Sequence, residues 1–175
     1  YYYYDKILYK FKGLPKILGF EEAQHLYYAR QFKGNLVSTS DEEFKTLVDS
    51  FGQNKNDETI NQALKLLSKD PTNLDLLMII VQVYRNKGDE NNFIFRLNQF
   101  RLLVEAIKSS GDGKSQKTPF VVNTVGDEYV LLSVLNIDLN AYTRSSKRTK
   151  GGMLDIWSKG DDNIYIKVAF PAHNF

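Results

Sequence analysis

The segment LNQFRLLVEAIKSSGDGKSQKTPFVVNTV (residues 97–125) contains the point at which the periodicity of the chain changes. Up to Ser109 the apolar residues recur at steps of four and three, which is the spacing of one helix face. They are Phe93, Leu97, Phe100, Val104 and Ile107. After Gly111 the chain shows short apolar runs and residues that alternate, which favours strands. The change near residue 111 predicts an α+β fold.

Working back from this point, residues 1–110 show a series of helical patterns, and we expect Phe100 to be buried. Ser40 and Glu43 have the spacing of a capping box at a helix start. Gly88 is expected to take a left-handed conformation after a helix end. The predicted helices cover about residues 6–12, 21–32, 41–51, 56–69, 73–87 and 89–109.

Forward from residue 111, the short turns and the lack of expected helices predict an antiparallel meander. Its apolar face needs a cover, which the helices can supply. We therefore expect a single α+β domain over residues 1–175, in which a helical region of residues 1–110 packs on a β-sheet region of residues 111–175. The expected strands are 120–125, 129–135, 141–145, 153–158 and 164–170.

Composition excludes several classes of function. The 175 residues include 23 Lys and Arg against 21 Asp and Glu. The net charge of +2 is too small to indicate a nucleic acid as the binding partner. The absence of cysteine rules out disulfides and thiolate metal sites. His25 and His173 are the only histidines, so we expect no metal and no cofactor. No apolar run is long enough for a membrane span.

The loop Gly111-Asp112-Gly113-Lys114-Ser115 is the first candidate site. It ends like a phosphate-binding loop, but Lys108 stands where that motif needs a glycine, and no strand precedes it. One interpretation is a connecting loop in which Gly111 is left-handed and the Asp112 carboxylate binds backbone N–H groups. The other is a ligand-binding loop with polar contacts from Asp112, Lys114 and Ser115.

Aromatic residues crowd the beginning of the chain, and Tyr27 and Tyr28 form the second candidate site. Exposed tyrosines could stack on a sugar or contact a partner protein, whereas buried ones would pack between elements. Farther along, the run Arg144, Lys147, Arg148 and Lys150 contains no acid. Such a run protects a sheet edge or contacts an anionic glycan or phosphate.

Asp127 and Glu128 are adjacent acids that could suggest a hydrolase. Adjacent residues on a strand point to opposite faces and cannot flank one bond, so the other interpretation is that they are acids of a loop or of a strand start. No nucleophile motif accompanies any of the serines considered, which are Ser115, Ser133 and Ser145. We therefore predict no catalytic residue.

Two resemblances extend these observations. Residues 63–107 are weakly similar to tetratricopeptide repeats, through the junction Lys69–Asn73 and through Tyr84 and Gly88-Asp89, although Phe93 stands where that repeat has a small residue. The whole chain resembles a family of exported Bacteroidetes proteins that is described as a domain of unknown function. The motifs that carry this resemblance are Tyr2-Tyr3-Tyr4, Lys6–Leu8, His25–Tyr28, Ser109–Ser115 with its Ser-Gly-Asp-Gly run, and Asp127–Tyr129.

This second resemblance implies export to the periplasm or cell surface and implies no activity. Because the chain begins at Tyr1, we expect that a preceding segment has been removed. The expected function is a non-catalytic interaction or scaffold module of the cell envelope with a protein or glycan partner. A carbohydrate or small-ligand binding protein and an unrecognised hydrolase are the alternatives, and the oligomeric state stays open.

Overall fold

The computed structural model describes residues 2–34 and 36–170, and the chain divides into two compact units. Unit 1 comprises Tyr1–Leu103 and unit 2 comprises Val104–Phe175. The boundary lies within a helix, shortly before the predicted change at residues 110–111. Whether the units act as one domain stays a prediction, and each is described by itself.

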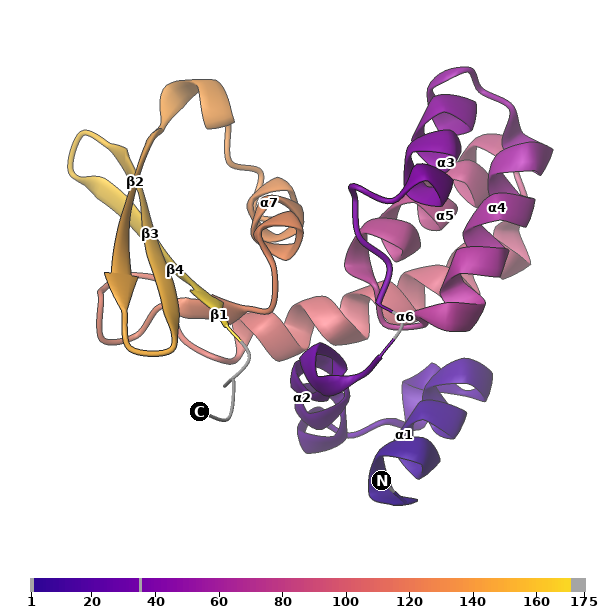
Figure 1. The fold of residues 1–175 in the computed structure, drawn as a ribbon, viewed down its shortest axis with the longest axis horizontal. Coiled ribbons are helices and arrows are strands. Elements are labelled where there is room, and N and C mark those ends of the chain that lie inside the picture. The colour runs from indigo at the N-terminus through magenta and orange to yellow at the C-terminus, as the bar shows by residue number, and fades with distance from the viewer. Residues whose placement is uncertain (1, 35, 171–175) are drawn as a thin grey trace. The chain divides into compact units, whose positions relative to one another are not determined.

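Unit 1 is built from helices, as the apolar spacing predicts (Figure 1). The elements are α1 (Tyr2–Gly13), η1 (Pro15–Ile17), α2 (Phe20–Ala29), η2 (Arg30–Phe32), α3 (Glu42–Gly52), α4 (Asn56–Lys69), α5 (Leu74–Lys87) and α6 (Glu90–Lys108), which continues into unit 2. Helix α4 packs against both α3 and α5. The largest fully buried side chains of this unit are Ile7, Phe11, Leu26, Tyr27, Leu47, Leu74, Leu76, Leu77, Ile80 and Leu103.

Local signals account for both ends of α5. The Asn73 side chain accepts a hydrogen bond from the N–H of Leu76 at 3.2 Å and caps α5. Gly88 ends α5 with a φ of +73°, which confirms its predicted conformation. The capping box at Ser40 was a wrong prediction. Asp41 occupies the position before α3 and accepts the N–H of Ser38 at 2.9 Å, which tightens the preceding turn instead.

Unit 2 contains a mixed sheet with the strand order β1-β4-β3-β2, which confirms the α+β class. Strands β2 (Thr143–Thr149), β3 (Gly152–Lys159) and β4 (Asp162–Ala169) form the predicted antiparallel meander. Strand β1 (Phe120–Val122) departs from it, because it pairs in parallel with β4. The chain passes through a helix, β2 and β3 before it returns beside β1, and such a crossover permits parallel pairing.

Helix α7 (Val125–Val134) replaces the strand predicted at residues 129–135. The Thr124 hydroxyl accepts the N–H of Asp127 at 3.0 Å and begins the helix. A short continuous apolar run fits a buried helix as well as a buried strand, so periodicity could not separate them. Helix α7 contacts β1 and β4 and covers one face of the sheet (Figure 1). A short helix η3 (Leu139–Ala141) leads to β2.

The core of unit 2 lies between α7 and the sheet. Leu131, Val122 and Ile166 are fully buried there, from α7, β1 and β4 respectively. Ile107 of α6 is also buried, as its place in the helical stripe predicts. Phe100 is only half-buried, so its predicted burial was wrong.

Candidate functional site

The loop at residues 111–118 is held by a dense local network. The Asp112 carboxylate accepts hydrogen bonds from the Thr118 hydroxyl at 2.6 Å and from the N–H of Lys114 at 2.9 Å. These two donors lower the pKa of Asp112 below its ordinary value. The Ser115 and Thr118 hydroxyls lie 2.9 Å apart. Asp112 therefore binds its own loop, as one of the two interpretations predicts, while Lys114 projects into solvent.

The two glycines of this loop serve close packing. A Cβ on Gly111 would lie 2.2 Å from the carbonyl oxygen of Pro119, so only glycine fits there. The left-handed residue is Gly113, with a φ of +67°, and the prediction of that conformation for Gly111 was wrong. The carbonyl of Gly113 accepts the N–H of Tyr165 at 2.8 Å, which fixes the loop beside β4. A ligand role for this loop stays a prediction.

The two tyrosines of the second candidate site have different surroundings. The Tyr27 ring is 0% exposed and meets the half-buried Tyr28 ring edge to face, with centroids 4.8 Å apart. This geometry is that of core packing. Aromatic side chains that do reach the surface of unit 1 include Phe32, on η2, and Tyr3, on α1.

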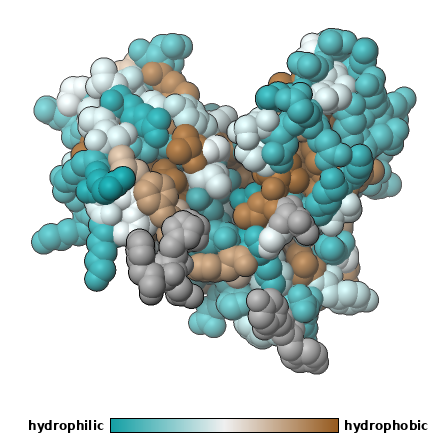
Figure 2. Space-filling view, viewed as in Figure 1, coloured by the Kyte–Doolittle hydropathy of each residue, from teal (hydrophilic) through white to brown (hydrophobic). Residues whose placement is uncertain are grey.

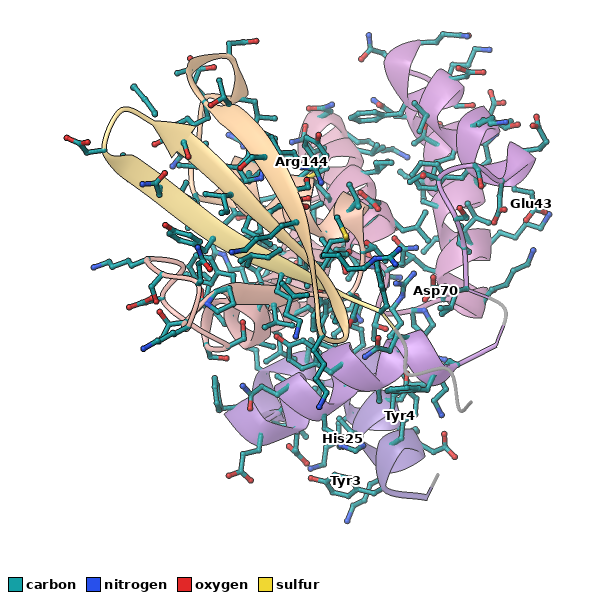
Figure 3. The ribbon with its side chains drawn as sticks, turned by 60° about the vertical axis from the view of Figure 1, so that its left-hand side comes forward. Tyr3, Tyr4, His25, Glu43, Asp70 and Arg144 are labelled. Carbon is teal, nitrogen blue, oxygen red and sulfur yellow. The ribbon has the colours of Figure 1, made fainter. Side chains whose placement is uncertain are left out.

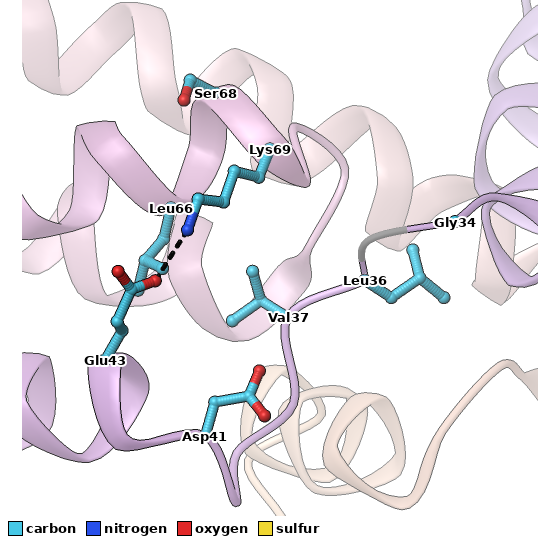
Figure 4. A pocket seen from close by; sticks show the side chains of 8 residues that line it. All are labelled: Gly34, Leu36, Val37, Asp41, Glu43, Leu66, Ser68 and Lys69. Carbon is cyan, nitrogen blue, oxygen red and sulfur yellow. Dashed lines mark hydrogen bonds and ion pairs between the residues drawn. The ribbon is translucent and has the colours of Figure 1, made fainter.

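Unit 1 contains a series of open cavities that share walls. The largest, about 580 Å³, is lined by Leu36, Val37, Asp41, Glu43, Leu66 and Lys69 together with Gly34 and Ser68 (Figure 4). A cavity of about 230 Å³ shares Glu43 and Leu66 with it and lies along α3 and α4. A third, of about 290 Å³, shares Leu36 and Lys69 with the largest.

A fourth cavity, of about 180 Å³, shares Tyr4 and Lys33 with the third. His25, Ala29 and Phe32 complete its lining. The four cavities therefore follow one another from α1 and α2, along residues 33–34 and 36–41, to the space between α3 and α4. We call this series the unit 1 groove. No sequence pattern signals it, because its walls come from five separate segments.

The floor of the unit 1 groove contains a buried ion pair. The Asp70 carboxylate, which is almost fully buried, accepts the Nε and Nη2 of Arg30 at 2.9 and 2.6 Å. It also accepts the N–H of Val37 at 3.0 Å and the Asn73 side-chain amide at 3.0 Å. The carboxylate therefore accepts four hydrogen bonds and fixes the segment around Val37 to the start of α5.

Aromatic and charged groups gather at the α1–α2 end of the groove, where Tyr3, Tyr4 and His25 lie close together (Figure 3). The Tyr3 and His25 ring centroids are 5.1 Å apart. The Lys33 ammonium lies 3.7 Å from the Tyr4 ring centroid, a cation–π distance. Burial, followed by the charge of Asp70, raises the pKa of Tyr4. This hydroxyl therefore stays protonated.

At the other end of the groove, Glu43 on α3 bridges two lysines of α4. Its carboxylate oxygens accept from Lys65 at 2.9 Å and from Lys69 at 2.8 Å. These hydrogen bonds and charges lower the pKa of Glu43 to about 2. Figure 2 shows hydrophilic side chains spread over α3 and α4 (upper right).

Unit 2 contains a buried carboxylate pair that the sequence reasoning missed. Glu128 of α7 and Asp155 of β3 are both buried, and Nη2 of Arg144 donates to each, at 2.9 and 2.6 Å. The indole N–H of Trp157 donates to Glu128 at 2.7 Å, and the Ser146 hydroxyl donates to Asp155. Burial, aided by the charge of Asp155, raises the pKa of Glu128 to about 7, although Trp157 and Arg144 oppose the shift.

The helical form of α7 explains this error. The sequence pattern placed Asp127 and Glu128 in a loop or at a strand start, before the strand expected at residues 129–135, whereas the helix directs Glu128 onto the sheet. The basic run lies on β2, at an edge of the sheet, as one of its interpretations predicts. Arg144 turns inward to the carboxylates, while Lys147 and Arg148 are exposed.

Within residues 2–34 and 36–170, no group of three or more His, Asp or Glu side chains is placed to hold a metal ion. His173 lies outside the described residues. Among the helices that the structure describes, none is long and apolar enough to cross a membrane.

Comparison with known proteins gives one match. No curated protein and no solved structure matches the chain. A family model described as a domain of unknown function, DUF4919, matches residues 1–169. This match covers nearly the whole sequence, including the groove of unit 1 and the sheet of unit 2. The chain therefore belongs to the DUF4919 family.

Proposed function

We propose that this protein is a non-catalytic interaction module and that the unit 1 groove binds an extended segment of a partner protein. The observation that carries the proposal is the succession of four open cavities, each of which shares wall residues with the next, from Tyr4 to Glu43. A compact small molecule would fill one such cavity, whereas an extended chain can occupy successive ones.

The lining of the groove suits a peptide. Leu36 is an exposed apolar side chain in the lining, and the largely buried Val37 and Leu66 lie beside it together with the charged Asp41 and Lys69. An apolar centre with a polar surround is typical of surfaces that bind another protein. The segment around Val37 is held by the buried Asp70, so this portion of the wall is already ordered before a partner binds.

The charged groups of the groove support a binding role over catalysis. Glu43 is fully ionised at neutral pH and is held by two lysines, which makes it a poor general acid or base. Asp70 is buried and accepts hydrogen bonds from Arg30, Val37 and Asn73, which gives it a structural role in the wall of the groove.

The test is selection of peptides from a displayed random library on the full chain, followed by calorimetric titration of an enriched peptide. Leu36 is 37% exposed and lines two of the cavities, so Leu36→Glu should weaken binding by about tenfold or more. Ile94, on α6, is 43% exposed and lines none of these cavities. Ile94→Glu is the matched control and should bind as the wild type does.

The proposal fails if the selection enriches no peptide, or if an enriched peptide binds no more tightly than a peptide with the same residues in scrambled order. It fails equally if the enriched peptide binds Leu36→Glu as tightly as it binds the wild type. Thermal melting of both variants establishes that any loss of binding reflects the groove and not unfolding.

A carbohydrate ligand is the second candidate, favoured by the aromatic end of the groove. Phe32 is 65% exposed and lines the same cavity as Tyr4 and His25, an arrangement on which a sugar ring can stack. On a glycan array, a hit lost in Phe32→Ala but kept in Phe20→Ala would favour this candidate. Phe20 is 54% exposed and does not line the cavity.

We also propose that the protein acts in the cell envelope after export. The resemblance to exported Bacteroidetes proteins supports this location, together with a sequence free of cysteine, which tolerates an oxidising compartment. Fractionation of the native cells with an antibody to this chain tests it. Recovery from the cytosolic fraction alone would refute it.

A further inference from the structure

The second face of the unit 2 sheet, opposite α7, is rich in lysines. Strand register places Lys147 of β2 opposite Leu154 of β3, and Leu154 opposite Lys167 of β4. The two lysines therefore flank one buried leucine in a single cross-strand row. Since neighbouring strands lie about 4.8 Å apart, their Cα atoms are roughly 10 Å apart.

The loop at residues 111–118 and the β2–β3 turn extend this row. The Lys147 ammonium donates to the side-chain carbonyl of Gln116 at 2.6 Å, which places the loop beside β2. The Lys167 ammonium donates to the carbonyl of Lys150 at 2.9 Å, which places the turn beside β4. We define the lysine face as Lys114, Lys117, Lys147, Lys150 and Lys167.

The five cations of the lysine face differ in their partners from lysines of unit 1. Within the described stretches of the chain, none of them lies within 4 Å of an Asp or Glu oxygen, although several lysines of unit 1 do form such pairs. Asp112, the acid nearest in sequence to Lys114, accepts hydrogen bonds from Thr118 and from the backbone of Lys114, and the charge of Lys114 also acts on it at longer range. A surface with unneutralised charges of one sign attracts an anionic partner.

The side chains around the lysine face indicate which class of anionic partner fits it. Around the lysines, β2 presents the exposed polar side chains of Thr143 and Ser145, which suit hydroxyl-rich ligands. The large apolar side chains that β2–β4 place on this face, Leu154, Ile156 and Tyr165, are buried or half-buried. Insertion into a membrane and anchoring of a peptide both use exposed apolar side chains. Each lysine ammonium is a single point charge, and ammonium groups that lie several ångströms apart can pair with separate charges along a polymer. An arginine guanidinium would instead bind one carboxylate or phosphate through two hydrogen bonds.

We propose that the lysine face of unit 2 binds a linear acidic polysaccharide that carries carboxylates along its length. The site is separate from the unit 1 groove, and it gives the lysines of the Gly-Asp-Gly-Lys loop a role beyond that of a connection. Ion pairs form between successive lysines and successive sugar carboxylates, so binding weakens as salt rises.

The test uses oligogalacturonate as the probe and neutral dextran as its uncharged counterpart. In calorimetric titrations of the full chain at low ionic strength, oligogalacturonate should bind and dextran should not. Lys147→Gln combined with Lys167→Gln should weaken binding roughly tenfold, since two surface ion pairs are lost. Arg148→Gln is the matched control, because Arg148 is exposed on the same strand but points to the opposite face. It should change binding by less than about twofold.

Lys114→Gln combined with Lys117→Gln provides a second variant, confined to the loop, which should also weaken binding by several-fold. Absence of oligogalacturonate binding by the wild type overturns the proposal. So does an equal loss in Arg148→Gln, or tighter binding of poly-glutamate or of phosphatidylglycerol vesicles than of oligogalacturonate. None of these results bears on the groove, because its library-selected peptide is measured separately with Leu36→Glu.

Discussion

Replacing Glu128 by glutamine tests the buried carboxylate pair of unit 2. Glutamine keeps the acceptor for the indole N–H of Trp157 and removes the ionisable group. Glu128 is buried against Asp155, and Arg144 supplies a single guanidinium for both carboxylates. The wild-type protein therefore holds a proton on Glu128 that the unfolded chain would release.

The size of the effect follows from the pKa. Folding raises the pKa of Glu128 from 4.5 to about 7. A native pKa above the unfolded value means that the native state binds more protons between these two limits. The contribution of Glu128 to the free energy of unfolding is therefore greatest below about pH 4.5, and it falls as the pH rises to about 7. The total loss over this window is about 3 kcal/mol.

The assay is urea denaturation at a series of pH values from 5 to 8, followed by the fluorescence of Trp157. This residue is the only tryptophan of the chain and lies beside Glu128, so its signal reports on unit 2. The wild type should lose stability between pH 5 and pH 7, and Glu128→Gln should lose most of that slope. A wild-type stability that rises or stays level over this range, or an unchanged slope in the variant, would show that folding does not hold Glu128 protonated.

Three further predictions test other features of the two units. Gly113→Ala should destabilise unit 2 by about 2–4 kcal/mol, because the backbone is left-handed there and the new Cβ would lie 2.3 Å from the Phe120 ring. Gly160→Ala, in open space, is the control and should cost about 1 kcal/mol. Urea titrations followed by Trp157 fluorescence compare the two variants. Asp70→Asn should cost about 3–5 kcal/mol by far-UV circular dichroism, because the buried Arg30 loses its counter-charge, and a loss below about 1 kcal/mol would contradict that role. Phe11→Ala should cost about 3–5 kcal/mol and Phe32→Ala less than about 0.5 kcal/mol in the same assay, so equal losses would show that the helical stripe of α1 is misassigned.

Much of the fold could be predicted from local chemistry. Periodic apolar residues located the helices, and Gly88 ended α5 as expected. The alternation around Ile164–Val168 and the turn at Gly160 located the last hairpin of the sheet. These signals succeed because a face buried on one side fixes the spacing of its apolar residues.

Other elements of unit 2 depend on contacts that are distant in sequence. The run Tyr129–Val134 is short and almost continuously apolar, so its pattern does not distinguish a helix from a strand. The cap at Thr124 was the local signal that could have done so. The parallel pairing of β1 with β4 could not be predicted, because a three-residue strand gives no register or direction by itself.

The candidate sites, like the elements of the fold, could be predicted where they depend on local contacts and not where they depend on contacts distant in sequence. The network of Asp112 within its own loop is local and followed from turn chemistry. The pairing of Glu128 with Asp155 requires α7 to be a helix, so an incorrect assignment of that element concealed it. The groove joins Tyr4, Leu36 and Leu66 from separate segments, and no sequence pattern brings these together.

Hydrogen exchange of the full chain with and without a library-selected peptide is the sharpest test of the binding role of the groove. We predict slower exchange of the amides around Val37 and along the end of α4, with the strands of unit 2 unchanged. Protection confined to unit 2, or to surfaces of unit 1 outside the groove, would contradict the proposal that this groove is the partner-binding site.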